Sequence, residues 1–190
     1  MRLVMCVTCS ICGFAPQSLF VPSIGTMEAT KQWWGPRIWR ILHCLAEFSD
    51  RSDCGLAWRS VLRATAEVLP CDLCKTHMRT ANGSIGLVQP RPAADMRTLL
   101  RHYLWLLHQA SATVGISEED LSGFYGGDRS TILQSVRVGA REIDEAFRRL
   151  HVLDRFHEGG LRAWVQAVDH LSHLLWTPEP PPRPMRGRRR

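Results

Sequence analysis

The sequence has no long apolar run and no stretch in which apolar and polar residues alternate. A membrane-spanning helix needs about 20 consecutive, mostly apolar residues. No segment of the 190-residue chain is that long and that apolar. Strict alternation is the pattern of a half-buried strand. These two absences predict an all-α fold and no membrane-spanning segment.

The chain also lacks a basic domain, although its formal net charge is +6. Residues 178–190 carry five arginines against Glu179 and so account for +4 of that charge. The rest of the chain is close to neutral, which argues against a nucleic-acid-binding domain. We interpret the Pro/Arg-rich segment 177–190 as a disordered, solvated tail, and we do not expect it to contact nucleic acid.

The first 30 residues lack the pattern of an ordered element. They are largely apolar without a helical period, and two prolines interrupt them. They match a secretory signal only weakly, because the apolar run is short and has no clear cleavage site. We interpret them as a disordered leader. Its Cys6, Cys9 and Cys12 form either a redox-shuttle group or incidental cysteines, and we favour the second interpretation.

Elsewhere, apolar residues recur at intervals of three and four, which is the spacing of one helical face. The first such segment places Pro36 in its opening turn, where a missing N–H is tolerated. Asn82-Gly83 is expected to end the third segment, and Gly159-Gly160 to separate the last two. The predicted helices are 33–48, 56–69, 72–78, 95–112, 130–153 and 161–176.

A cysteine pair, Cys71-Asp72-Leu73-Cys74, lies between two of these helices and is followed by His77. Pro70 ends the preceding helix, so the pair begins the next one, where the helix dipole favours a thiolate. Three interpretations are open: a redox disulfide, half of a zinc site, or two core cysteines. A c-type haem site is excluded, because Lys75 stands where such a site requires histidine.

Aromatic and histidine residues on both sides of the pair complete an ordered pattern. It begins with Trp34-Gly35-Pro36-x-x-Trp39-x-x-x-His43, continues with the pair and His77, and ends with Tyr103-Leu104-Trp105-x-x-His108. In order and spacing, this pattern resembles the Erv/ALR family of flavin-linked sulfhydryl oxidases. The resemblance covers about residues 33–116.

The resemblance implies a small four- or five-helix bundle that binds FAD beside the cysteine pair. Residues 31–118 would form this domain, and residues 119–176 would add two C-terminal helices of unknown role. Cys71 would be attacked by substrate thiols, and Cys74 would lie next to the flavin. The implied cofactor contacts come from Gly35, Trp39, His43, Cys74, His77, Trp105, His108, Gln109 and Ala112.

The chain departs from the family pattern on the adenine side of the cofactor. In the family's His-Asn-x-Val-Asn motif, Gln109, Ser111 and Ala112 replace the last three named residues, and Met78 replaces the phenylalanine after His77. No cysteine follows Cys74, so the family's further structural disulfide has no counterpart. Such trimmed sequences resemble the viral members of the family.

The resulting hypothesis is a thiol oxidase. A dithiol on a protein or on a thioredoxin-like relay would reduce the Cys71–Cys74 disulfide. FAD would then pass the electrons to O2 and give hydrogen peroxide. A homodimer is expected. Family members work in the mitochondrial intermembrane space, in the secretory pathway, or, for viral members, in the host cytoplasm or virion. The leader sequence does not indicate which of these compartments applies.

Two alternatives stay open. One is a zinc-binding helical interaction module that uses Cys71, Cys74 and His77, with Cys44 or Cys54 as a further ligand. The other is a flavin-free relative of the family in which the bundle serves as a scaffold. The zinc module does not account for the Trp-Gly-Pro-x-x-Trp segment.

Overall fold

The computed structural model describes residues 27–69, 72–84, 93–111, 117, 121, 127–149 and 155–177. The regular elements within these residues are all helices, which confirms the predicted all-α class. Among the described helices, none is both long enough and apolar enough to cross a membrane. The helices are α1 (Met27–Glu47), α2 (Gly55–Val68), α3 (Asp72–Ser84), α4 (Ala93–Ser111), α6 (Arg129–Arg149) and α7 (Arg155–Trp176).

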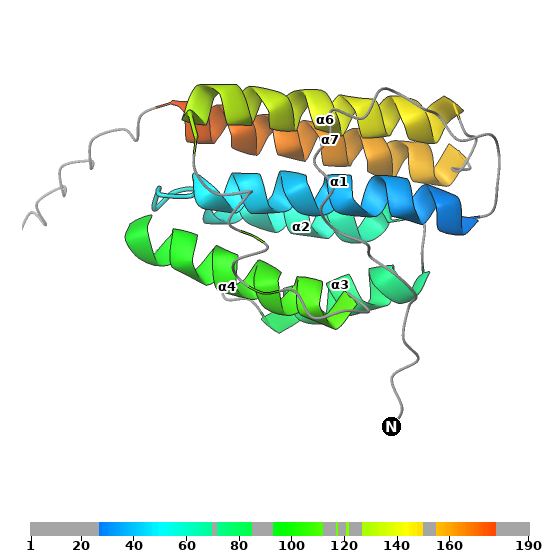
Figure 1. The fold of residues 1–190 in the computed structure, drawn as a ribbon, viewed down its shortest axis with the longest axis horizontal. Coiled ribbons are helices and arrows are strands. Elements are labelled where there is room, and N and C mark those ends of the chain that lie inside the picture. Colours follow the sequence, from blue (N-terminus) through cyan, green and yellow to red (C-terminus); the bar gives the residue numbers. More distant parts are fainter. Residues whose placement is uncertain are drawn as a thin grey trace, which may run out of the picture.

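The helices form three layers, with α1 and α2 in the middle (Figure 1). On one side, α6 packs along α1 and α7 along α2; on the other, α4 packs on α1 and α3 on α2. One continuous apolar core runs through these contacts. The two helices expected as a C-terminal addition therefore share their core with the segment expected to form the domain.

Two fully buried tryptophans anchor this core. The indole of Trp58 donates a hydrogen bond to Ser49 Oγ at 2.6 Å, and that of Trp164 donates to Thr65 Oγ1 at 3.0 Å. A buried indole N–H needs such an acceptor. Trp34 is also buried and packs edge-on against Phe147. For these three tryptophans, the role in the structure is core packing.

The prediction that Pro36 lies in a first turn is wrong. Helix α1 begins at Met27, so Pro36 lies in its interior, and residues 27–30 belong to the helix and not to the leader. An interior proline cannot donate to the carbonyl four residues earlier, here that of Gln32. One missing bond does not end the helix, because the segment after it is buried between α4 and α6.

The predicted break at Gly159-Gly160 is also wrong, because both glycines lie inside α7. Helix α3 ends at Ser84, directly after Asn82-Gly83, as predicted. A helical glycine costs about 1 kcal/mol relative to alanine. Packing of α7 along α2 outweighs that cost: a Cβ at Gly160 would lie 3.8 Å from the Cβ of Glu67. Sequence spacing alone does not reveal such tertiary support.

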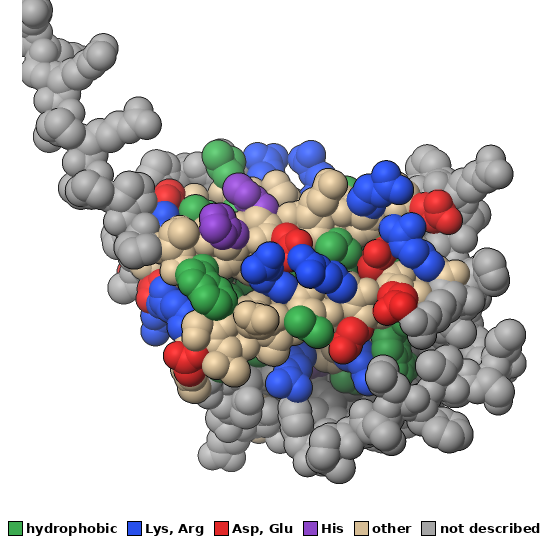
Figure 2. Space-filling view, turned by 90° about the horizontal axis from the view of Figure 1, so that it is seen from above, with side chains coloured by type: hydrophobic (Ala, Val, Ile, Leu, Met, Phe, Trp, Pro, Cys, Tyr) green, Lys and Arg blue, Asp and Glu red, His purple; other side chains and the backbone are tan. Residues whose placement is uncertain are grey.

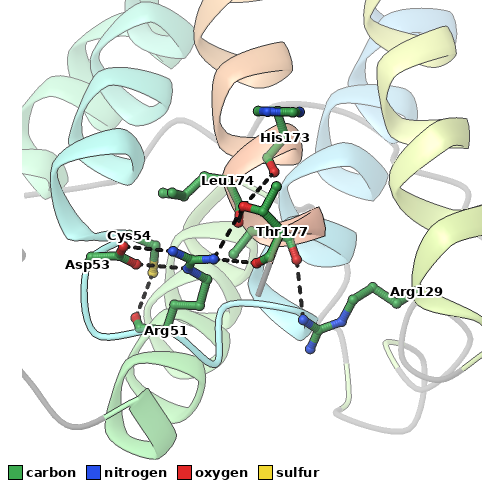
Figure 3. A network of polar contacts seen from close by, with 8 residues as sticks. Arg51, Asp53, Cys54, Arg129, His173, Leu174 and Thr177 are labelled. Atoms are coloured by element: carbon green, nitrogen blue, oxygen red, sulfur yellow. Dashed lines mark hydrogen bonds and ion pairs between the residues drawn. The ribbon is translucent and has the colours of Figure 1, made fainter. Parts of the chain in front are cut away.

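The loop between α1 and α2 is tied to the end of α7 by a buried arginine (Figure 3). The Arg51 side chain, 4% exposed, pairs with both carboxylate oxygens of Asp53 at 2.9 and 2.7 Å. It also donates to the carbonyl of Thr177, while Arg129 Nη1 donates to that of Leu175 at 3.2 Å. The last carbonyls of a helix have no partner within it, and cations there complement the helix dipole. Both arginines therefore cap α7.

Asp50, in the same loop, connects the two outer layers. Its Oδ2 accepts a hydrogen bond from Arg97 of α4 at 3.0 Å and another from Arg129 of α6. The α1–α2 loop is thus the place where charged contacts from α4, α6 and α7 meet.

The outer face of α6 and α7 is polar. Acidic and basic side chains are intermixed on it, with apolar side chains scattered between them (Figure 2). Asp169 of α7 accepts from Arg137 at 2.9 Å and from Arg141 at 3.3 Å, both on α6. These pairs hold the two helices side by side across the solvent-facing surface.

Replacing Arg51 with methionine tests the capping of α7. Hydrogen bonds to a charged group contribute about 1.5–3 kcal/mol, so we expect Arg51→Met to lower the free energy of unfolding by about 2–3 kcal/mol in urea denaturation. Arg59→Met, at an exposed position of α2, is the matched control and should change stability by less than about 0.5 kcal/mol. Equal losses in the two variants would contradict the capping role.

Candidate functional site

Three of the predicted site residues meet between α1 and α4. Trp39 and His43 lie one turn apart on α1, and His108 reaches them from α4. The rings of Trp39 and His108 are stacked, with centroids 4.1 Å apart and planes inclined by 12°. His43 lies at the edge of this stack, 6.0 Å from Trp39 and 5.4 Å from His108 between centroids.

The two histidines share a hydrogen bond. His43 Nε2 and His108 Nδ1 are 3.2 Å apart, and both residues are buried, at 0% and 2% exposure. Whichever tautomers are present, one ring donates its N–H and the other accepts. Two positively charged rings could not make this bond, because neither would have an accepting nitrogen.

Burial keeps this pair neutral. It lowers the pKa of His43 to about 4. Burial, and then the neighbouring His43, lower the pKa of His108 to about 3. Both rings are therefore uncharged at pH 7, and the pair adds no charge to the space between α1 and α4.

A salt bridge one turn from His43 sets α4 against α1. Arg101 of α4 pairs with Glu47, which is four residues after His43 on α1 and has a side chain only 14% exposed. Residues four apart lie on one face of a helix. The ion pair and the histidine pair thus lie along the same line of contact between the two helices.

This geometry limits where a planar cofactor could bind. A separation of 4.1 Å is already a direct ring contact, so no planar group fits between Trp39 and His108. An aromatic ligand fits only against the outside of the stack, where Trp39 is partly exposed. Gly35, one turn earlier on α1, has open space beside it: a Cβ built there would meet nothing within 4 Å. The partly exposed face of Trp39 is therefore the surface of this cluster against which a planar ring could stack.

Cys74 lies on a different helix. It occupies the first turn of α3, is half-buried against the core and is disulfide-bonded. Helix α3 packs against α2 and α4. Its sulfur partner is not Cys44 or Cys54, because both of these are free thiols. Cys71 lies outside the described residues.

The remaining predicted cofactor contacts are scattered. His77 is half-buried on α3, one turn after Cys74, and Gln109 is half-buried beside His108 on α4. Trp105 packs against His102 of the same helix, with centroids 5.8 Å apart. Ala112 lies outside the described residues. Among the predicted cofactor contacts, Trp39, His43 and His108 are therefore the ones that lie in direct contact with one another.

The further zinc ligands suggested by the sequence, Cys44 and Cys54, are both buried and outside any disulfide. Burial raises the pKa of Cys44, and burial, followed by the charge of Asp53, raises that of Cys54 to about 11. The Cys54 thiol donates to the carbonyl of Arg51 at 3.1 Å. A sulfur in a disulfide, as in Cys74, is no zinc ligand either. Across the described part of the chain, no three metal-ligating side chains converge.

Sequence reasoning missed the setting of Lys75. Its side chain is only 12% exposed, and its Nζ lies 3.7 Å from the fully exposed carboxylate of Asp72. The available signal was their separation of three residues, which puts them on one helical face.

Acid should weaken the fold through the histidine pair. Their folded pKa values lie below the ordinary value of 6.5, so the unfolded chain binds protons first as the pH falls. The free energy of unfolding is therefore highest above about pH 6.5. It falls as the pH drops toward 4, by up to about 1.4 kcal/mol per pH unit for each histidine. Urea denaturation at pH 7.5, 6.0 and 5.0 measures this slope.

A His43→Gln/His108→Gln double variant is the control for that slope. It should be less stable at pH 7.5, but its stability should change little between pH 6.5 and 4.5. Asp53 and Asp128 also have lowered pKa values, and they act only below about pH 4, where unfolded aspartates take up protons. An unchanged slope in the double variant would show that the buried pair is not the acid-sensitive element.

Comparison with known proteins gives this chain no relative: no family model, no curated protein and no solved structure matches it. The resemblance to the Erv/ALR oxidases therefore rests on the order and spacing of the motifs in the sequence.

Proposed function

We propose that the protein is an FAD-dependent thiol oxidase that forms disulfide bonds in protein dithiols. The observation that carries the proposal is the disulfide-bonded Cys74 in the first turn of α3, in a helical bundle that also gathers Trp39, His43 and His108. A helix N-terminus favours a thiolate, so a disulfide there is easier to reduce than one in neutral surroundings. The order of the motifs supplies the flavin part of the proposal.

The reaction begins as thiol–disulfide exchange, with Cys71 as the proposed partner of Cys74. A substrate thiolate attacks the Cys71 sulfur, a new S–S bond forms there, and the electron pair of the broken bond stays on Cys74 as a thiolate. The second thiolate of the substrate then attacks the substrate sulfur of this mixed disulfide. The substrate leaves with its own disulfide, and the cysteine pair keeps the two electrons.

FAD, when bound, would take this electron pair from the cysteines and deliver it to O2, giving hydrogen peroxide. The residues proposed to hold it are Gly35, Trp39, His43, His77, Trp105, His108, Gln109 and Ala112. Among them, Trp39 offers a partly exposed face for stacking, and the buried, neutral histidine pair packs against Trp39. Burying a charged imidazolium here would cost free energy. Because the pKa values of both histidines are low, the rings stay neutral and this cost does not arise.

The proposed partners are protein thiols or a thioredoxin-like relay, with O2 as the electron acceptor and a homodimer as the assembly. The flavin-free scaffold is the competing proposal, and it is favoured by the replacements at Gln109 and Ala112. The colour of the purified protein separates the two, because bound flavin is yellow and a scaffold is colourless.

Oxygen uptake with a small dithiol tests the oxidase. The wild-type protein should carry FAD and consume O2 when dithiothreitol is added, with hydrogen peroxide as product. Cys74→Ser should bring turnover down to the background of dithiol autoxidation while the flavin stays bound, since only the electron relay is removed. Absorbance spectra and an oxygen electrode measure the two quantities.

Cys54→Ala is the matched control, because Cys54 is a buried free thiol outside the proposed relay. It should remain yellow and active. A colourless wild-type protein without thiol-dependent oxygen uptake would rule out the oxidase. Activity that survives in Cys74→Ser would show that the redox centre lies elsewhere.

A further inference from the structure

Lys75, the residue after Cys74, is packed in an unusual way for a lysine. Its side chain is 12% exposed, although lysines normally extend into solvent. Its ammonium lies 3.7 Å from Asp72 Oδ1, so the side chain runs back toward the start of α3. Helical side chains lean in this direction. The charge is therefore held at the first turn of the helix, where Cys74 also lies.

The neighbouring charges leave Lys75 as the cation of this turn. Asp72 is its counter-charge and is fully exposed, at 101% for the side chain. Arg79, further along α3, is bound to Glu67 of α2 at 2.7 Å on the solvent side. Of the two lysines in the chain, Lys31 lies on α1. A screened, exposed pair such as Arg79–Glu67 contributes little field at a distance.

We propose that the Lys75 ammonium stabilises the Cys74 thiolate that forms when the disulfide is opened, and that Asp72 moderates this effect. The inference rests on the proposed thiol-oxidase function, in which Cys74 is the leaving sulfur. Lys75 touches neither substrate nor cofactor in this role. It acts through Cys74, as an electrostatic positioning residue.

The chemistry needs such a cation at one step. When a substrate thiolate bonds to the other sulfur of the disulfide, the S–S bond breaks and both of its electrons remain on Cys74. A nearby positive charge lowers the free energy of that thiolate, and a thiol of lower pKa leaves faster. The partly buried position strengthens the effect, because a pair away from bulk water is screened less.

Alkylation of the reduced protein measures this effect without any turnover. The rate at which iodoacetamide modifies Cys74 is followed against pH by peptide mass spectrometry, and its midpoint is the thiol pKa. We expect Lys75→Met to raise the midpoint by about one pH unit, which is a tenfold smaller thiolate fraction near neutral pH. Lys75→Arg, which keeps the charge, should restore the wild-type midpoint.

Two further variants bracket the result. Asp72→Asn removes the exposed counter-charge and should lower the midpoint. Because Asp72 is solvent-exposed, this variant keeps the test usable if Lys75→Met does not fold. Arg79→Met removes an equally charged residue of the same helix and should leave the midpoint unchanged.

An unchanged midpoint in Lys75→Met and in Asp72→Asn would overturn the inference, and so would an equal shift in Arg79→Met. The readout is independent of oxygen uptake. A shifted midpoint in a protein that consumes no O2 would support the Lys75 role and refute the oxidase. If the protein is an active oxidase but the alkylation midpoint of Cys74 is the same in wild type and Lys75→Met, only the Lys75 role is refuted.

Discussion

The middle layer of the bundle is covered on both sides, and this double burial governs the rest of the structure. Helix α1 packs against α6 and α4, and α2 packs against α7 and α3. A polar side chain buried on either helix therefore needs a hydrogen-bond partner within the protein. His43 shares a hydrogen bond with His108 on α4, and Thr65 Oγ1 accepts one from the indole of Trp164 on α7. The polar contacts in the core thus fix which helix lies beside which.

The same constraint divides the candidate site into two parts with different chemistry. The histidine pair and Trp39 lie in the seam between α1 and α4, where burial removes charge. Cys74 and Lys75 lie on α3, in an outer layer, where Cys74 is half-buried and the ammonium of Lys75 keeps a charge next to the exposed Asp72. One part of the candidate site is thus neutral and buried, and the other carries charge.

The sequence predicted the order of the helices found in the described residues, because apolar spacing is a local property. It also placed Trp39 and His43 on one helical face. It failed at Pro36 and at Gly159-Gly160, where packing of whole helices outweighs local preference. The hydrogen bond between His43 and His108 joins residues 65 apart in the chain. The family resemblance made both of them cofactor contacts but did not predict a bond between them. Arg51 pairs locally with Asp53, but its contact with the carbonyl of Thr177 joins residues 126 apart, and no local pattern predicts it.

Covering α1 and α2 on both sides also has a consequence for self-association. The surfaces that two copies of this chain could present to each other belong to the outer layers, because α6 and α7 shield one side of the central pair and α3 and α4 the other (Figure 1). On the α6–α7 side, the shared carboxylate of Asp169 already occupies Arg137 and Arg141. A second copy approaching there would have to exchange these internal ion pairs for intermolecular ones, so salt concentration would govern any such assembly.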